Sequence, residues 1–265
     1  MTSLLLPLLL LAAPEPQVPG AAALCPLEVP EYAAGLACIA ETGRNWSFAF
    51  AYPRVAAELP GLARELDARR GAAREEFATL EAYAAEHQEG RFYHQEVYRF
   101  DADRPEFVAL RARIDEYAGG AHPWSGTRAL IWDRGGDRQV AFADLFADPA
   151  AARAEIARLY CPAIVAVRRR KAEESGGRFS GGCGEPPEDG SPVGGADGRI
   201  DTLRLSPGEM DGYASGPYEV LIPVTPRLLQ ALKPRYRAAF RVSRRTAAVG
   251  CNEGVPDPAC AASRR

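Results

Sequence analysis

The sequence predicts an α+β fold in two subdomains, each an antiparallel sheet packed by helices. Three apolar, strand-like runs follow one another at residues 107–118, 127–132 and 140–142, and Gly-rich turns at 119–120 and 134–137 separate them. Because such turns join neighbouring antiparallel strands most simply, the three runs are expected to form a meander. Apolar residues at helical spacing before and after the meander predict the helices that cover the sheets.

The first half of the chain alternates strand and helix patterns. Residues 46–52 alternate large and small side chains, as a half-buried strand does, and Pro53 ends the run. Apolar residues between 55 and 84 recur at steps of three, four and seven, which predicts an amphipathic helix from about Pro60, either continuous or broken at Gly71. Residues 92–100 predict another strand. In 107–118, the face expected to be buried carries Val108, Leu110, Ala112, Ile114 and Glu116.

The second half begins with a helix that Asp148 caps and Pro149 starts, and Pro162 is expected to kink or split it. Residues 173–199 are rich in Gly, Ser, Pro and acidic groups, so a mobile insertion is expected there. Residues 219–224 predict a closing strand, and Thr225 with Pro226 caps a helix after it. The tail after residue 240 is expected to be irregular.

The amino-terminal residues are typical of a secretory signal. An apolar block at 4–13 precedes the small residues Ala21, Ala22 and Ala23, which predicts a signal peptide at residues 1–23. No Lys or Arg precedes the block, so an N-terminal anchor or a disordered apolar tail is the alternative. Leu24 occupies a position where lipoprotein signals need a small residue, which disfavours lipidation of Cys25. No transmembrane anchor is expected.

Charge and cysteine content narrow the class of protein. The net charge is −3, and removal of 1–23 leaves 34 acidic and 32 basic side chains, a balance that argues against nucleic acid as a partner. The six cysteines form no C-x-x-C motif, so disulfides are favoured over zinc or redox sites. Their order along the chain suggests the pairs below, with crossed pairs or one reduced pair as alternatives. The pairs are Cys25 with Cys38, Cys161 with Cys183, and Cys251 with Cys260.

Catalytic motifs are missing from the sequence. The three histidines form no H-E-x-x-H motif, and no G-x-S-x-G motif is present. His94 and His122, supported by Glu96 or Glu116, are the one combination that could form a metal or acid–base site, but a histidine before proline is more often a turn residue. We therefore predict no catalytic residue, no metal and no cofactor.

Aromatic residues near the turns are the candidate binding residues. Tyrosine and tryptophan anchor protein interfaces and also stack on sugars, although packing at a sheet end is the plainer explanation. The aromatic set comprises Tyr117, Trp124, Trp132, Tyr213 and Tyr218.

Three segments carry a family resemblance. Tyr117-Ala-Gly-Gly-Ala-His-Pro123, Asp144-Leu-Phe146 and residues 213–223 occur in the order found in the extracellular domain of RsiV-type anti-sigma factors and PdaC-type peptidoglycan deacetylases, which this chain resembles. Residues 24–116 are similar to the smaller domain that precedes it in PdaC-like proteins. The resemblance implies an RsiV-like subdomain at 117–240 with the insertion 173–199, followed by a Cys-containing tail at 241–265.

This resemblance implies a periplasmic or secreted, non-catalytic recognition protein of the bacterial cell envelope that binds lysozyme or peptidoglycan. The sigma-binding segment, the membrane helix and the deacetylase domain of those relatives are not found in the sequence. The predicted binding residues are Tyr117, His122, Trp124, Tyr213 and Tyr218. A peptidoglycan-modifying enzyme and a structural envelope protein without a ligand are the alternatives.

Overall fold

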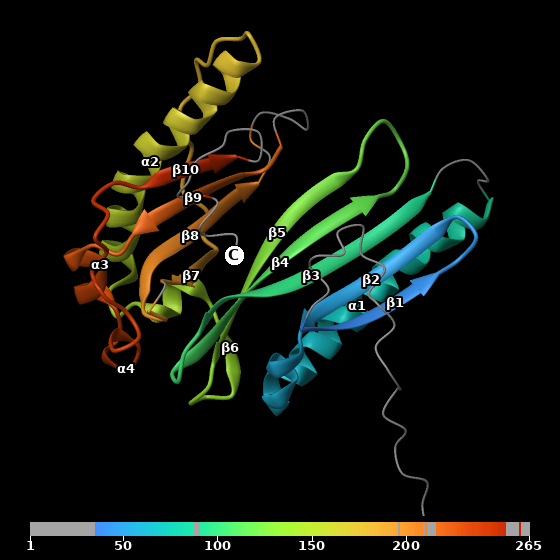
Figure 1. The fold of residues 1–265 in the computed structure, drawn as a ribbon, viewed down its shortest axis with the longest axis horizontal. Helices are drawn as coiled ribbons and strands as arrows, with labels where there is room; N and C mark the ends of the chain where they lie inside the picture. Colours follow the sequence, from blue (N-terminus) through green and yellow to red (C-terminus); the bar gives the residue numbers. More distant parts are fainter. Residues whose placement is uncertain are drawn as a thin grey trace, which may run out of the picture.

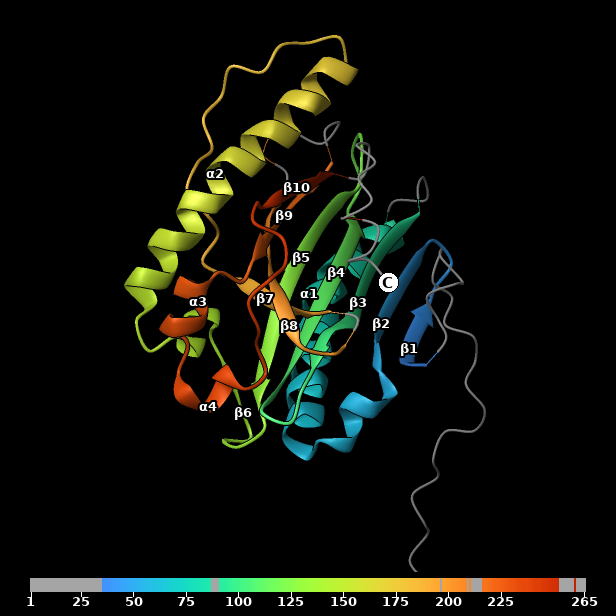
Figure 2. The ribbon, with the colours of Figure 1, turned by 60° about the vertical axis from the view of Figure 1, so that its left-hand side comes forward.

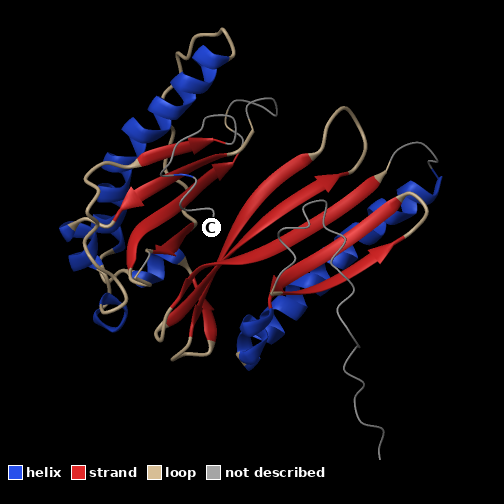
Figure 3. Cartoon of the chain, viewed as in Figure 1, coloured by secondary structure: helices blue, strands red, loops and turns tan. Residues whose placement is uncertain are grey.

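Two sheets make up the described part of the chain, which covers residues 35–86, 91–195, 197–208, 210, 216–252 and 260 of this computed structural model (Figure 1). The first sheet has the strand order β1-β2-β3-β4-β5-β6, and the second has the order β10-β9-β8-β7. Helices α1 and α2 lie on the outer sides of the two sheets (Figure 3). This arrangement confirms the predicted α+β fold in two parts.

The first sheet comprises β1 (Leu36–Thr42), β2 (Trp46–Pro53), β3 (Phe92–Asp103), β4 (Phe107–Tyr117), β5 (Trp124–Asp133) and β6 (Arg138–Val140). The second sheet comprises β7 (Gly190–Gly194), β8 (Ile200–Gly208), β9 (Tyr218–Pro223) and β10 (Val249–Asn252). The helices are η2 (Arg54–Glu58), α1 (Pro60–Glu86), η3 (Phe142–Leu145), α2 (Pro149–Glu174), α3 (Pro226–Ala231) and α4 (Pro234–Arg237).

The predicted meander is β4-β5-β6, and its strands pair antiparallel. Strand β5 pairs with β4 along its whole length, but β6 covers only the last three residues of β5. Among the described strands, none pairs with residues 124–130 of β5 on that side. The predicted division between residues 116 and 117 falls inside this sheet, because β5 and β6 pair with β4 rather than with the second sheet. The two sheets divide after Val140 instead.

Helix α1 joins β2 to the parallel strand β3 and is continuous through Gly71. In contrast to the prediction, the first sheet is therefore not wholly antiparallel, because the helix brings the chain back in the same direction. It crosses the sheet diagonally. Near its start, Arg64 lies 3.6 Å from Asp137 in the β5–β6 turn, and near its end the Asn45 side-chain amide donates to the Ala84 carbonyl over 2.6 Å. Its buried residues are Gly61, Leu62, Leu66, Ala73, Phe77 and Ala84.

Strand β4 is buried on both faces along its first half. The face predicted to be buried is indeed buried from Val108 to Ile114, but Phe107 and Ala109 on the other face are buried as well. The second subdomain covers this other face. The ring of Phe107 packs edge-on against that of Tyr236, and the two ring centroids lie 5.8 Å apart. The alternating pattern did not reveal this second layer.

Helix α2 covers the second sheet (Figure 2), and the Asp148 side chain caps it by accepting from the Ala151 amide. The helix continues through Pro162 to Glu174, so Pro162 does not split it. Thr225 caps α3 as predicted, accepting from the Leu228 amide.

Two segments expected to be irregular contain strands. Strand β7 lies within 173–199 and pairs with β8, so the expectation of one unstructured insertion is wrong at its C-terminal end. Pro192 is tolerated there because β7 is an edge strand, where one N–H is not needed. Strand β10 lies in the predicted irregular tail and pairs with β9, which puts Cys251 in the sheet.

The structure contains the disulfides Cys161–Cys183 and Cys251–Cys260, with Cα atoms 4.9 and 5.8 Å apart, which are the pairs suggested by chain order. Cys38 is disulfide-bonded too, while its expected partner Cys25 and the whole of residues 1–34 lie outside the described residues. None of the described helices combines the length and apolar composition that a bilayer crossing requires.

A buried charge network joins the two sheets. Arg204 of β8 is 1% exposed, and its guanidinium donates to Asp101 of β3 over 2.9 Å. Conversely, Arg111 of β4 in the first sheet lies 3.5 Å from Glu219 of β9 in the second sheet. Buried charges are tolerated only when they are paired, so this network fixes how the two sheets face each other.

Candidate binding surface and pocket

The diagonal path of α1 leaves one corner of the first sheet uncovered, at the start of β5. Three side chains that face the α1 side are exposed there, and we call them the open corner: Glu116, Trp124 and Arg128. Trp124 is 53% exposed, and the side chains of Arg128 and Glu116 are 49% and 37% exposed. Glu116 and Trp124 are direct cross-strand neighbours. The corner thus combines a large aromatic ring with one charge of each sign.

A glycine leaves room for the Trp124 side chain. The indole lies over Gly126, two residues along the same face of β5, and a Cβ at Gly126 would overlap the ring. The missing side chain therefore lets the indole approach the strand at this point, while the residue stays 53% exposed.

Buried side chains contact the two charged groups of the open corner, Glu116 and Arg128. The His94 ring stacks on Phe48 and its Nδ1 lies 2.9 Å from the Glu116 carboxylate. His94 Nε2 is buried and has no hydrogen-bond partner among the described residues. Its nearest acid there is Glu96, whose carboxylate lies 4.0 Å away.

Glu96 in turn holds Arg128. The Glu96 carboxylate is 1% exposed, accepts from the Tyr98 hydroxyl over 2.6 Å and lies 3.5 Å from the Arg128 guanidinium. Burial, and secondly the charge of Glu96, raises the pKa of Tyr98, so this hydroxyl stays protonated and keeps donating. Both exposed charges of the corner are thus oriented by buried partners.

The structure separates the predicted binding residues. Trp124 lies in the open corner, and His122 is exposed in the β4–β5 turn with Nδ1 3.3 Å from the Pro123 carbonyl. Tyr117 donates to the Gly120 carbonyl over 2.8 Å, which fastens that turn. Tyr218 is 1% exposed in the core, so it cannot take part in a surface, and that prediction is wrong. Tyr213 lies outside the described residues.

The alternative His94–His122 site does not form. His94 is buried beside Glu116 and Glu96, whereas His122 is exposed in the turn. Among the described residues, no group of three His, Cys, Asp or Glu side chains is placed to hold a metal ion. Trp132, the remaining aromatic of the set, is buried and donates to Asp137.

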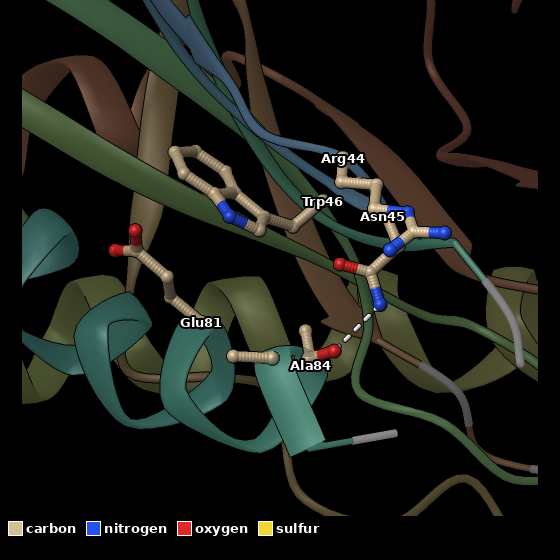
Figure 4. Close-up of a pocket in the computed structure, with 6 residues that line it drawn as sticks. Arg44, Asn45, Trp46, Glu81 and Ala84 are labelled. Atoms are coloured by element: carbon tan, nitrogen blue, oxygen red, sulfur yellow. Dashed lines mark hydrogen bonds between the residues drawn. The ribbon is translucent and has the colours of Figure 1, made fainter. Parts of the chain in front are cut away.

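A pocket of about 310 Å³ lies at the carboxyl end of α1, where the helix meets the β1–β2 turn (Figure 4). We call it the helix-end pocket. The turn and the start of β2 line one side, and the last turns of the helix line the other. Its lining residues are Arg44, Asn45, Trp46, Glu81, Ala84 and Ala85. No pattern in the sequence indicates this pocket.

No family model and no curated protein sequence matches this chain. Among solved structures, a DUF3298 family protein from Pseudomonas aeruginosa superposes with a TM-score of 0.51 at 15% identity, over 79% of this chain and 97% of that one. The chain shares the fold of this DUF3298 protein. A DUF3298 family member from Bacteroides fragilis is also similar, with a TM-score of 0.49 at 18% identity over 76% of this chain and 93% of that one.

This DUF3298-like fold includes both halves of the chain, because the matched portion of 79% is longer than either sheet region alone. The shared fold therefore includes parts of both the six-stranded and the four-stranded sheet regions.

Proposed function

We propose that this chain is an exported, non-catalytic recognition protein of the bacterial cell envelope, and that its open corner binds a protein partner. The exposed indole of Trp124, which lies over Gly126 and is flanked by Glu116 and Arg128, is the observation that carries the proposal. Tryptophan and arginine are the residues that most often dominate the binding energy of protein interfaces. The corner is an open surface, which suits a protein better than a small substrate.

The support beneath the corner favours tight recognition. Glu116 and Arg128 are already oriented by His94 and Glu96, so little side-chain freedom is lost when a partner binds. A partner that offers one basic and one acidic group beside an apolar surface would complement the three side chains.

Lysozyme is the partner that the RsiV-like resemblance favours. Without residues 1–23 the chain has 34 acidic and 32 basic side chains, a small acidic excess that attracts a basic protein such as lysozyme only weakly and is too small for strong steering. Peptidoglycan is the alternative ligand. A peptidoglycan-modifying enzyme and a structural envelope protein remain the alternative classes.

Co-elution tests the proposal. The chain lacking residues 1–23 and lysozyme are passed together through a sizing column, and a complex is expected that Trp124→Ala abolishes at the same concentrations. Val55→Ala, which trims a 50% exposed side chain beyond the far end of β2, is the control and should leave the complex intact. Absence of a complex, or a complex that Trp124→Ala leaves intact, would contradict the proposed protein partner, and hydrolysis of muropeptides would contradict the non-catalytic role.

Export has its own test. Mass spectrometry of the protein recovered from the periplasm should show a chain that begins near Leu24, without six free thiols. An intact Met1 in that fraction would contradict the signal peptide.

A further inference from the structure

The helix-end pocket is built from fixed parts. The Asn45 side chain donates to the Ala84 carbonyl over 2.6 Å, which ties the β1–β2 turn to the last turn of α1 (Figure 4). The Asn45 carbonyl also accepts from the Phe92 amide over 2.9 Å. The two walls of the pocket are thereby held at a set separation.

Its aromatic wall is equally constrained. The Arg74 guanidinium lies 5.6 Å from the centre of the Trp46 ring, and Phe77 meets the ring edge-on at 5.7 Å. Arg74 is itself held by Glu41 at 2.8 Å and by Glu81 at 2.7 Å. Gly43 leaves room for the indole, because a Cβ there would overlap it.

The polar groups of the pocket include both hydrogen-bond donors and acceptors. Arg44 lines the pocket, is exposed and supplies guanidinium donors. Across the pocket, Glu81 and the Ala84 carbonyl offer acceptor oxygens. The charge of Glu81 is balanced by Arg74, so the pocket has no excess of acidic charge that would select a cation.

We infer that the helix-end pocket binds one pyranose ring of an N-acetylated amino sugar. One face of such a ring presents C–H groups to the negative face of an indole, and its hydroxyls need donors and acceptors on both sides. Its amide carbonyl accepts from Arg44, and its methyl group lies on the exposed Ala85. A volume of 310 Å³ is at the lower end of the range for ligand pockets, which is room for one ring but not for a chain.

This site is separate from the open corner and does not depend on the protein partner proposed for it. A chain that fails to bind lysozyme can still bind the sugar, and the reverse also holds. The two proposals are therefore distinguishable by their ligands and by the tryptophan that responds.

The indole N–H resonances provide the test. The protein has three tryptophans, so a ¹⁵N correlation spectrum of the full chain shows three indole signals, assigned with Trp46→Phe and Trp124→Phe variants. N-acetylglucosamine should move the Trp46 signal, with a dissociation constant on the order of millimolar, as expected for a one-ring ligand. Glucose, which lacks the acetamido group, should bind at least about threefold more weakly.

Three variants at exposed residues complete the design. Arg44→Ala should weaken binding by about three- to tenfold, the worth of one hydrogen bond. Ala85→Leu should block the pocket, whereas Ala82→Leu, also on the exposed side of α1 near its end but outside the pocket lining, should leave binding unchanged. No shift at Trp46, a shift at Trp124 instead, or equal binding by the Ala85→Leu protein would overturn the inference.

Discussion

The indole of Trp124 lies over Gly126, and a side chain at residue 126 would occupy the same space. The most exposed of the large apolar side chains in the described part of the chain therefore occupies space that depends on this glycine. Among the described strands, β6 pairs only with residues 131–133 of β5, so Trp124 lies where β5 has no partner on that side.

Gly126→Ala should displace the indole without removing it. Lysozyme binding is expected to weaken about as much as in Trp124→Ala, because the hot-spot ring is no longer in its bound position. Titration by surface plasmon resonance measures the loss. Gly135→Ala, at a glycine in the β5–β6 turn with more room around it, is the control. Undiminished binding by the Gly126→Ala protein would show that the position of the ring is unimportant.

Arg204→Met should destabilise the fold by about 3–5 kcal/mol, because it leaves Asp101 buried without its closest charge partner. Arg153→Met, which removes a surface ion pair with the 89% exposed Glu185, should cost no more than about 1 kcal/mol. Urea unfolding compares the two variants with the unaltered protein. Equal losses would mean that the inter-sheet network contributes no more than a surface pair.

Glu155 of α2 should give the stability a dependence on acid pH. Its hydrogen bonds from Arg158, and to a lesser degree from Thr225, hold the pKa of this carboxyl below its ordinary value. A lowered folded-state pKa contributes stability above the unfolded value of about 4.3, and that stability is lost as pH falls through the folded pKa.

Glu155→Gln should therefore cost stability at pH 7, roughly 1–2 kcal/mol, and the difference from the unaltered protein should shrink below about pH 4. Thermal unfolding between pH 3 and pH 8 measures this difference in stability, and Glu185→Gln, at an exposed residue, is the control. A difference that stays constant over the whole range would rule out the proposed linkage.

Loss of the Cys161–Cys183 disulfide should loosen the segment between α2 and β7. The bridge spans 22 residues, which corresponds to about 3 kcal/mol of loop-closure entropy. In a Cys161→Ser/Cys183→Ser variant, trypsin should cut after Arg178 first and faster than in the oxidised protein. Gel electrophoresis of samples taken at intervals shows the order and rate of cleavage. A first cut within the β4–β5 hairpin would contradict the assignment of the meander to the core.

Regular patterns made the fold partly predictable. The alternation at β2 and β3, the stripe of α1, the turns of the meander and the caps at Asp148 and Thr225 are all local signals, and all form as expected. Strand β7 gave no such signal, because Gly190, Pro192 and Gly194 are poor strand residues that pair only through the neighbouring β8.

Only those parts of the candidate site that a single conspicuous residue marks could be predicted from the sequence. Trp124 is conspicuous as a tryptophan beside a turn, but Tyr218 looks the same in sequence and is buried by α2 and its sheet. The helix-end pocket unites Asn45 with Ala84, which are 39 residues apart, and no periodicity links the two. Contacts between distant segments are set by packing rather than by local pattern.

Calorimetric titration of the protein with lysozyme tests the central claim most directly. Saturable heat is expected, with an affinity that falls at least about tenfold in Trp124→Ala, since truncating a hot-spot aromatic costs ~2 kcal/mol or more. The pocket variant Ala85→Leu should titrate like the unaltered protein. No heat with lysozyme, or equal affinity for the Trp124→Ala protein, would contradict recognition through the open corner.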